Sequence, residues 1–192
     1  MWKYAGVDRN GDWVVYDKNG EMISASMATE EDRRVVGNGM PKFTMSTTHN
    51  FRYRNFDLSL FFRGAFGFQI FNIHDFYYGT RNFNGNMLKK AYGKNFDVSP
   101  YSAPVVSDYF LENGDYFKLD MITLGYTLRL PQCRFIDKVR VYGTVNNVFT
   151  LTKFTGVDPS TYQVNGLQPG AQGDRSYYPS TRQFIVGLQV DF

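Results

Sequence analysis

The chain has 192 residues with a formal net charge of +3; 18% of them are aromatic, and no stretch of 18 apolar residues occurs. These features exclude a membrane-spanning helix, and the dispersed basic residues exclude a tract that follows nucleic-acid phosphates. Abundant Phe, Tyr and Gly among polar residues predict an all-β chain, which composition alone leaves as either a transmembrane barrel or a sugar-binding β-sandwich.

The first predicted long strands form a hairpin. Residues 42–53 alternate between apolar and polar side chains, and residues 56–67 repeat the alternation. A period of two residues is the pattern of a strand with one apolar and one polar face. Only Arg54 and Asn55 separate the two runs, which indicates a tight turn. The apolar faces consist of Phe43, Met45, Phe51 and Tyr53, and of Phe56, Leu58, Leu60, Phe62 and Phe66.

Two further strands are predicted at residues 116–128 and 138–151, and each contains an irregularity. In the first strand the apolar series slips by one residue, so we expect a β-bulge near Asp120 and Met121. In the second strand Asn147 falls on the apolar side, which indicates either a bulge or a position at the membrane interface. Outside these positions both segments keep the alternation of the hairpin.

The last predicted strand, residues 182–192, alternates most clearly. About ten residues suffice for a tilted strand to cross the hydrocarbon layer of a bilayer. Because the chain stops on an aromatic residue, its apolar face also resembles the terminal signal that the outer-membrane assembly machinery reads. The residues of this predicted assembly signal are Phe184, Val186, Leu188, Val190 and Phe192.

The connections between the strands differ in length. Residues 54–55 and 131–134 form short connections, whereas residues 1–40, 68–115 and 152–180 form long segments without a clear pattern. Short turns on one side and long loops on the other are typical of outer-membrane barrels, whose short turns are periplasmic. We therefore predict an antiparallel transmembrane β-barrel portion of about five strands, with long extracellular loops and short periplasmic turns.

The predicted strands are too few to close a barrel. Bacterial single-chain barrels have about eight strands or more, and an open sheet in lipid would leave backbone groups unpaired. The first residues also lack the apolar segment of a signal peptide, and Cys133, the single cysteine, allows no internal disulfide. We therefore expect the chain to be a segment of a longer protein.

Four motifs, taken in order, resemble a known family. GNGMPKF at residues 37–43 resembles the segment that opens the late strands of SusC/RagA-like, TonB-linked outer-membrane transporters, and NFDLSLFFRG at 55–64 resembles the strand that follows. DYFKLDMITLGYTL at 115–128 is similar to a later strand of that family, and VRVYGTVNNVFTLTKFTGVDP at 139–159 is similar to the penultimate strand and its loop.

The resemblance implies import of large nutrients, usually glycans and sometimes peptides, across the bacterial outer membrane. In this family TonB moves a plug domain inside the barrel, and a SusD-like surface lipoprotein caps the barrel. Residues 1–192 would then be the C-terminal barrel segment, without the plug domain and the early strands. The expected partners are the SusD-like lipoprotein, outer-membrane lipid, an oligosaccharide or peptide substrate, and TonB through the missing N-terminal part; no nucleic acid is expected.

Two sets of residues are candidates for contacts within such a transporter. Residues 73–83 place adjacent rings beside a guanidinium group, which suits sugars, although the rings could instead pack the loop against its neighbours or the cap. The candidates for contact with substrate or cap are Phe76, Tyr77, Tyr78 and Arg81. The charged residues predicted to face the lumen, where they could meet a plug, are Arg52, Arg63, Lys118 and Arg140.

No catalytic, cofactor-binding or metal-binding residues are predicted, and we expect no enzyme. The histidines His49 and His74 fall in different elements. Oxygen-bearing side chains between Asp8 and Asp12 resemble a calcium loop, but Trp13 stands where such a loop has glycine, so a turn is the favoured interpretation. Two alternatives stay open: a passive porin completed by other chains, and a soluble carbohydrate-binding β-sandwich.

Overall fold

The computed structural model describes residues 1–132, 135–161, 170 and 179–192, and the chain divides into two compact units. The sheet unit comprises Lys42–Phe66, Asp115–Lys153 and Tyr178–Phe192, and the loop unit comprises Met1–Pro41, Gly67–Gly114 and Phe154–Tyr177. Two residues of a predicted short turn, Cys133 and Arg134, lie outside the described residues, as does most of the predicted connection at 152–180. Each unit is described by itself.

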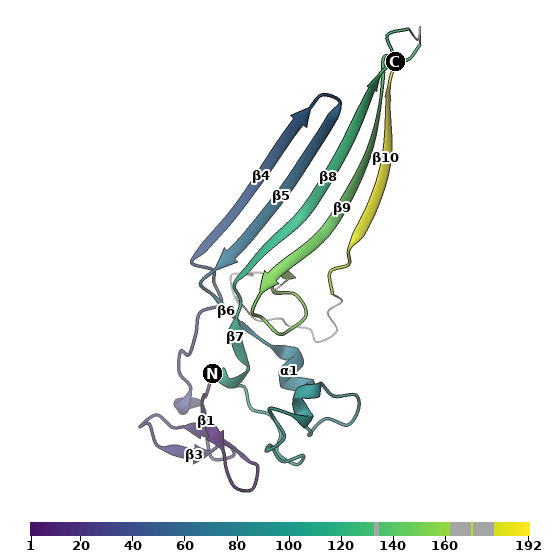
Figure 1. Ribbon diagram of the computed structural model, residues 1–192. Coiled ribbons are helices and arrows are strands. Elements are labelled where there is room, and N and C mark those ends of the chain that lie inside the picture. The colour runs from purple at the N-terminus through teal and green to yellow at the C-terminus, as the bar shows by residue number, and fades with distance from the viewer. Residues whose placement is uncertain (133–134, 162–169, 171–178) are drawn as a thin grey trace. The chain divides into compact units, whose positions relative to one another are not determined.

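The sheet unit is one antiparallel sheet whose five strands lie side by side in the order β10-β9-β8-β5-β4 (Figure 1). The strands are β4 (Phe43–Tyr53), β5 (Phe56–Phe66), β8 (Tyr116–Arg129), β9 (Lys138–Thr152) and β10 (Gln183–Asp191). Strands that follow one another within this unit are also neighbours in the sheet, so they run up and down in turn. The prediction of about five antiparallel strands is confirmed, and the sheet is open in the described residues.

The register of the sheet separates an apolar face from a polar one. Residues paired across an antiparallel ladder share a face, and successive residues of a strand point to opposite faces. One row across the apolar face consists of His49, Leu60, Ile122, Val145 and Phe184. The adjacent row on the polar face consists of Asn50, Ser59, Thr123, Thr144 and Ile185.

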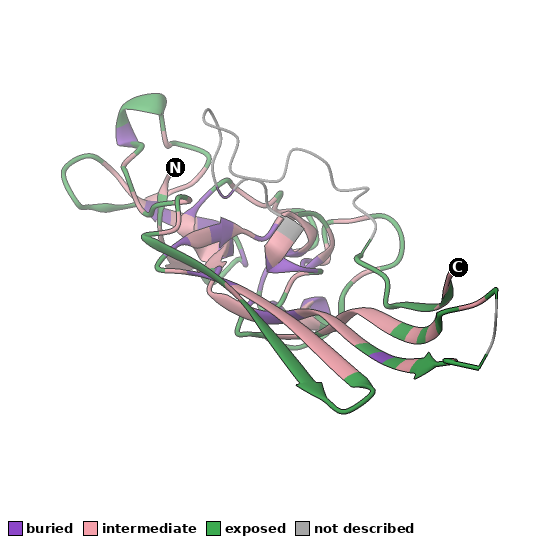
Figure 2. Ribbon diagram, turned by 90° about the horizontal axis from the view of Figure 1, so that it is seen from above, coloured by how far each residue is buried: buried purple, intermediate pink, exposed green. Residues whose placement is uncertain are grey.

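The apolar face is exposed over much of its area. Phe184 is 75% exposed and Val186 is 84% exposed, and Figure 2 shows the long strands almost entirely as intermediate or exposed. Soluble proteins rarely expose contiguous apolar patches larger than a few hundred Å². The face therefore requires a cover, and a bilayer is the cover expected for alternating strands of this length.

The β-bulge predicted in β8 is confirmed. The register of β8 against both β5 and β9 shifts between Leu119 and Met121, so Asp120 has no direct partner in either ladder. An extra residue in one strand turns the side chains that follow it to the other face. This shift explains why the apolar series of the sequence changes phase at this point.

A second bulge lies on β9 at Asn147. Its φ is +54°, a left-handed conformation that asparagine adopts more readily than most residues. The Asn147 side chain donates to the carbonyl oxygen of Thr181 at 2.7 Å, and the Arg182 guanidinium donates to the carbonyl oxygen of Val148 at 2.6 Å. The segment that leads into β10 therefore holds the bulge in place.

The loop unit contains short strands and helices. The prediction of long connections without regular structure was therefore wrong for these segments. Strands β1 (Lys3–Val7), β2 (Trp13–Tyr16) and β3 (Met22–Ser24) form an antiparallel sheet, and β6 (Gln69–Phe71) pairs with β7 (Leu111–Asn113). Elements this short cover too few residues for a period to be read. Only their contacts with one another define them.

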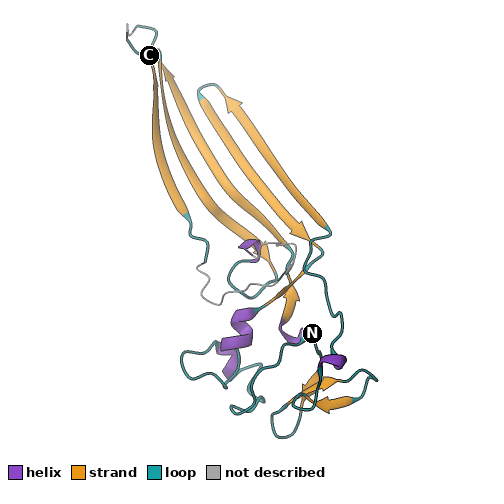
Figure 3. Ribbon diagram, turned by 180° about the vertical axis from the view of Figure 1, so that it is seen from behind, coloured by secondary structure: helices purple, strands orange, loops and turns teal. Residues whose placement is uncertain are grey.

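Helices are few in the described residues, as Figure 3 shows. The single α-helix there, α1 (Ile73–Tyr78), begins after Asn72, whose side-chain oxygen accepts the backbone N–H of Asp75 as an N-cap. The 3-10 helices are η1 (Glu30–Asp32), η2 (Lys89–Tyr92), η3 (Asp108–Phe110) and η4 (Pro159–Thr161). No described helix is long and apolar enough to cross a membrane.

The core of the loop unit is aromatic. Trp13, Val98 and Phe110 are buried together. The Trp13 ring lies 5.2 Å from the Tyr109 ring and 5.6 Å from the Phe110 ring, measured between centroids, and Phe76 packs on the same cluster. Aromatic rings bury large areas and gain further from edge-to-face contacts. This cluster joins β2, η3 and α1, which are far apart in the sequence.

Candidate functional site

The four charged residues predicted to face a lumen share one face of the sheet. Arg63 pairs directly with Lys118, and the alternation of the strands places Arg52 and Arg140 on the same side. This is the polar face, opposite Leu60 and its row. The register thus brings the four together on one surface, and their position in a lumen stays a prediction.

An ion pair crosses this polar face between β9 and β5. The Arg140 guanidinium donates to the Asp57 carboxylate twice, at 3.0 Å from Nε and at 2.5 Å from Nη2. Such a two-pronged pair fixes both side chains more firmly than a single contact does. The Arg140 guanidinium also lies over the Tyr142 ring, 5.0 Å from its centroid.

Gly125 makes this ion pair possible, because it lies on the strand between the two partners. β8 separates β9 from β5, and Gly125 pairs with Asp57 on one side and with Tyr142 on the other. A Cβ atom on Gly125 would lie 2.6 Å from Asp57 Oδ1 and 2.6 Å from Arg140 Nη2. Neither Asp57 nor Gly125 was predicted from the sequence as a site residue; a glycine on the polar side of the LGYTL segment was the available signal.

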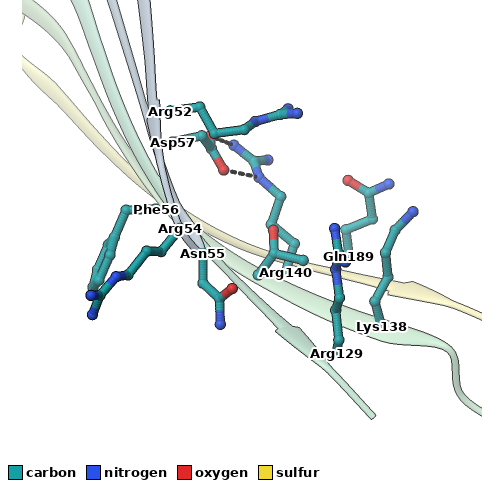
Figure 4. Close-up of a pocket in the computed structure, with 10 residues that line it drawn as sticks. Arg52, Arg54, Asn55, Phe56, Asp57, Arg129, Lys138, Arg140 and Gln189 are labelled. Atoms are coloured by element: carbon teal, nitrogen blue, oxygen red, sulfur yellow. Dashed lines mark hydrogen bonds and ion pairs between the residues drawn. The ribbon is translucent and has the colours of Figure 1, made fainter. Parts of the chain in front are cut away.

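A basic pocket of 430 Å³ surrounds this pair near the β4–β5 turn (Figure 4). It is lined by Arg52, Arg54, Asn55, Phe56, Asp57, Thr127, Arg129, Lys138, Arg140 and Gln189. Lys138 pairs with Asp191 at 2.6 Å, and Arg52 lies opposite Asp57 in the ladder, where its charge also attracts that carboxylate. Five cationic side chains and a single carboxylate, Asp57, line the pocket, so it suits an incoming carboxylate or another oxyanion.

A second charged group follows the β8 bulge. Asp120, the extra residue of the bulge, forms ion pairs with Arg63 and with Lys118, whose ammonium group lies 3.4 Å away. Lys118 is almost fully buried. A buried charge needs a partner because its desolvation is costly. The bulge therefore supplies the carboxylate that accompanies two of the predicted lumen-facing cations.

The predicted contact residues of the second long segment lie in and after α1. The Phe76 ring packs on Phe110 in the core, 5.2 Å between centroids, and the Tyr78 ring packs on Phe83 at 4.8 Å. The Arg81 guanidinium donates to two backbone carbonyl oxygens of residues 96 and 98. Tyr77 is the most exposed of the four. Contact with substrate or cap stays a prediction, and the exposed Tyr77 is best placed for it.

A half-buried polar network, which no pattern in the sequence predicted, holds the loop unit together around Glu112. The Lys90 ammonium lies 2.8 Å from Asp75 and 3.4 Å from Glu112. Glu112 also accepts the backbone N–H of Thr155 at 2.7 Å and the side-chain amide of Asn72 at 2.9 Å. The network joins β7, α1, η2 and residue 155, so its loss should loosen the unit.

This network predicts a pH dependence. Burial raises the pKa of Glu112, but hydrogen bonds from Thr155 and Asn72 and the Lys90 charge outweigh it and hold the pKa below the usual 4.5. Such a group stabilises the fold above pH 4.5, and that stabilisation is lost as the pH falls through the lowered value. The difference in loop-unit stability between the wild type and Glu112→Gln should therefore shrink below pH 4.5.

Hydrogen exchange of the loop unit in the full-length protein, followed from pH 7 to pH 3, checks this expectation. A difference between the two proteins that stays constant over that range would contradict it. Above neutral pH the network should persist. Burial lowers the pKa of Lys90, but Asp75 and Glu112 raise it above 10.5, so its contribution is present below pH 10.5 and is lost only above the raised value.

The Asp8–Asp12 segment is a turn, as favoured. The Asp8 carboxylate accepts the backbone N–H groups of Asn10 and Asp12, each at 2.8 Å, and Gly11 has φ +85°. His49 and His74 lie in different units. Across the described ranges, no three His, Cys, Asp or Glu side chains gather as a metal site requires.

Comparison with known proteins gives consistent results. The chain is 29% identical over 191 residues to the TonB-dependent receptor P3 of Formosa agariphila, and 28% identical over 200 residues to the TonB-dependent receptor SusC of Bacteroides thetaiotaomicron. Two structures of the RagAB peptide transporter superpose on all of this chain, with TM-scores of 0.76 and 0.74 at 23% and 22% identity. No family model matches the chain.

The resemblance to SusC/RagA-like transporters is confirmed. The matches to P3 and SusC cover 92% and 93% of this chain but only 18% of each receptor. The chain likewise covers 22% of the RagAB chains. It therefore spans about a fifth of the proteins it resembles. The open five-stranded sheet has the fold of the corresponding portion of a SusC/RagA-like barrel.

The SusC/RagA-like fold also explains why the sheet has two unlike faces. A barrel wall meets lipid on one side and its interior on the other, so alternate residues must differ along every strand. Four residues of the predicted assembly signal, Phe184, Val186, Leu188 and Val190, alternate along β10 and continue the apolar face, and Phe192 follows the strand. A β-sandwich core would instead need a second sheet packed on that face.

Proposed function

We propose that the chain forms part of the wall and outer loops of an outer-membrane, TonB-dependent importer of large nutrients. The observation that carries this proposal is the open sheet, which has an exposed apolar face and a charged opposite face. The similarity to SusC supports it, because it extends over 93% of this chain. A wall segment of this kind has no transport activity by itself. The activity belongs to the whole protein, of which residues 1–192 supply the C-terminal barrel segment.

In this proposal the apolar face contacts lipid and the polar face lines the lumen. Arg52, Arg63 and Arg140 then point into water or toward the plug domain. Lys118 is on the same face but is almost fully buried beside Asp120. The basic pocket supports this assignment, because five cationic side chains line it but only one carboxylate, Asp57, does. An acidic surface of the plug would balance this excess positive charge without exposing it to lipid.

The proposed partners follow from the same assignment. The turn between β4 and β5 is short, as periplasmic turns are, so the loop unit would lie on the extracellular side. A SusD-like lipoprotein would cap the barrel there and meet loop-unit residues such as Tyr77. TonB would act through parts of the protein other than residues 1–192.

The proposed substrate is an oligosaccharide, with peptide as the alternative. The RagAB structures are described as a peptide transporter, which is why peptides stay in consideration. Aromatic side chains and hydroxyl groups on the loop unit favour a sugar, because sugars present apolar C–H faces edged by hydroxyls. The relatives are named as receptors and importers, which supports transport rather than catalysis.

The decisive experiment measures uptake rather than binding. Deleting the gene of the full-length protein should abolish growth on the imported nutrient, and deleting TonB should have the same effect. Restoring the gene should restore growth only in cells that contain TonB. Growth that returns without TonB would instead favour the passive porin completed by other chains.

A further inference from the structure

A second pocket lies within the loop unit, between the β2–β3 sheet and the segment that follows Pro100. Its volume is 360 Å³. Its lining includes Asp12, Trp13, Ser24, Ser26, Tyr101 and Ser102. No lysine or arginine lines it. In this respect it is unlike the basic pocket of the sheet unit.

The two walls of the pocket are tied together at Gly11. The Gly11 carbonyl oxygen accepts the backbone N–H of Ser99 at 2.9 Å, and Gly11 has φ +85°. A Cβ atom there would lie 2.6 Å from the Ser99 nitrogen, so only glycine permits this approach. The Asp12 side of the pocket is thereby held against the Tyr101 side by the backbone.

The polar groups of the pocket are small and closely spaced. The Ser24 and Ser26 hydroxyls lie 2.9 Å apart, and Ser102 supplies a third hydroxyl. The Asp12 carboxylate accepts no hydrogen bond from a described residue. A carboxylate beside hydroxyls can accept and exchange hydrogen bonds with neighbouring hydroxyl groups of a ligand. It also disfavours an anionic ligand.

Two aromatic residues complete the pocket. Trp13 is 1% exposed, and its indole N–H has no hydrogen-bond partner among the described residues. Tyr101 is 94% exposed, so its ring gains little from its own fold. A large ring left in water beside a pocket is typical of a binding surface, because Tyr offers rigid contact area at low entropic cost.

We propose that this pocket binds one uncharged sugar ring of an oligosaccharide. Asp12 and the serine hydroxyls would bond the sugar hydroxyls, and the Tyr101 ring would cover a C–H face. The inference deepens the proposed function, because it assigns the glycan a specific capture site on the loop unit. A binding measurement can fail or succeed independently of uptake.

The test uses the purified full-length protein in detergent, titrated calorimetrically with maltohexaose, xylohexaose and mannohexaose, and with an uncharged hexapeptide. At least one hexasaccharide should bind. Tyr101→Ala should weaken its binding about three- to tenfold, and Asp12→Asn about tenfold. Tyr92→Ala is the matched control, since Tyr92 is 64% exposed in the same unit but does not line the pocket.

Three outcomes would overturn the inference: no hexasaccharide binds, the hexapeptide alone binds, or both pocket variants bind as tightly as the wild type. TonB-dependent growth of the Tyr101→Ala strain separates this inference from the proposed function. Persistent TonB-dependent uptake with unaltered sugar affinity would reject the pocket and leave the importer in place. Growth of the wild-type strain on the nutrient without TonB would reject the importer, whatever the titration shows.

Discussion

Replacing Leu60 with arginine should destabilise the full-length protein in lipid, lowering its free energy of unfolding by about 2–4 kcal/mol. Leu60 lies in the middle of β5 and pairs with Ile122 and His49 across the apolar face. At that depth a charged side chain has neither water nor a counter-ion, and the cost falls toward the membrane interfaces. Folding titrations in lipid vesicles measure it.

Thr144→Arg is the matched control on the polar face. Thr144 pairs with Thr123 at a similar depth, and their hydroxyl oxygens lie 2.8 Å apart. Losing that hydrogen bond should cost about 1 kcal/mol, and the new charge would meet a wet lumen. If the two arginine variants lost equal stability, the assignment of the faces would be wrong.

Phe110→Ala should destabilise the loop unit by about 3–5 kcal/mol and leave the sheet unit intact. Phe110 is fully buried, and its ring contacts Trp13, Phe71 and Phe76. Removing it creates a cavity where three segments of the chain meet. Protease cleavage within the loop unit should accelerate, while the heat-dependent gel mobility of the full-length barrel should stay unchanged.

Tyr92→Ala serves as the control for this variant, because Tyr92 is an exposed aromatic residue of the same unit. Its cleavage rate should match that of the wild type. Equal cleavage rates for Phe110→Ala and Tyr92→Ala would show that the aromatic cluster is not the core. Loss of the barrel's gel mobility in Phe110→Ala would show that the two units do not fold separately.

The five long strands were predictable from the sequence almost to their ends. The run predicted at residues 56–67 is β5 (Phe56–Phe66), and the run predicted at 138–151 is β9 (Lys138–Thr152). A strand between two unlike environments must alternate along its whole length, so the same pattern recurs over 9 to 15 residues in each of these strands. The bulge at Asp120 was readable for the same reason, since it reverses that alternation.

The loop unit was not readable in this way. Its strands and helices in the described residues are three to six residues long, and their periods are too short to separate from chance. Phe76 illustrates the consequence. In the sequence it is one of three adjacent rings suited to a ligand, and in the structure it packs on Phe110. Composition alone does not distinguish a ring that binds from a ring that packs.

By itself the sequence determined the all-β class, the long strands, their facing and the likeness to SusC/RagA-like transporters, because each of these depends on neighbours along the chain. Tertiary structure alone decided which charges meet. Arg140 reaches Asp57, 83 positions away, only because the register places Gly125 between them. The pocket of the loop unit likewise joins Asp12 to Tyr101 through one backbone contact at Gly11. Contacts between distant residues depend on register and close approach, which no local pattern encodes.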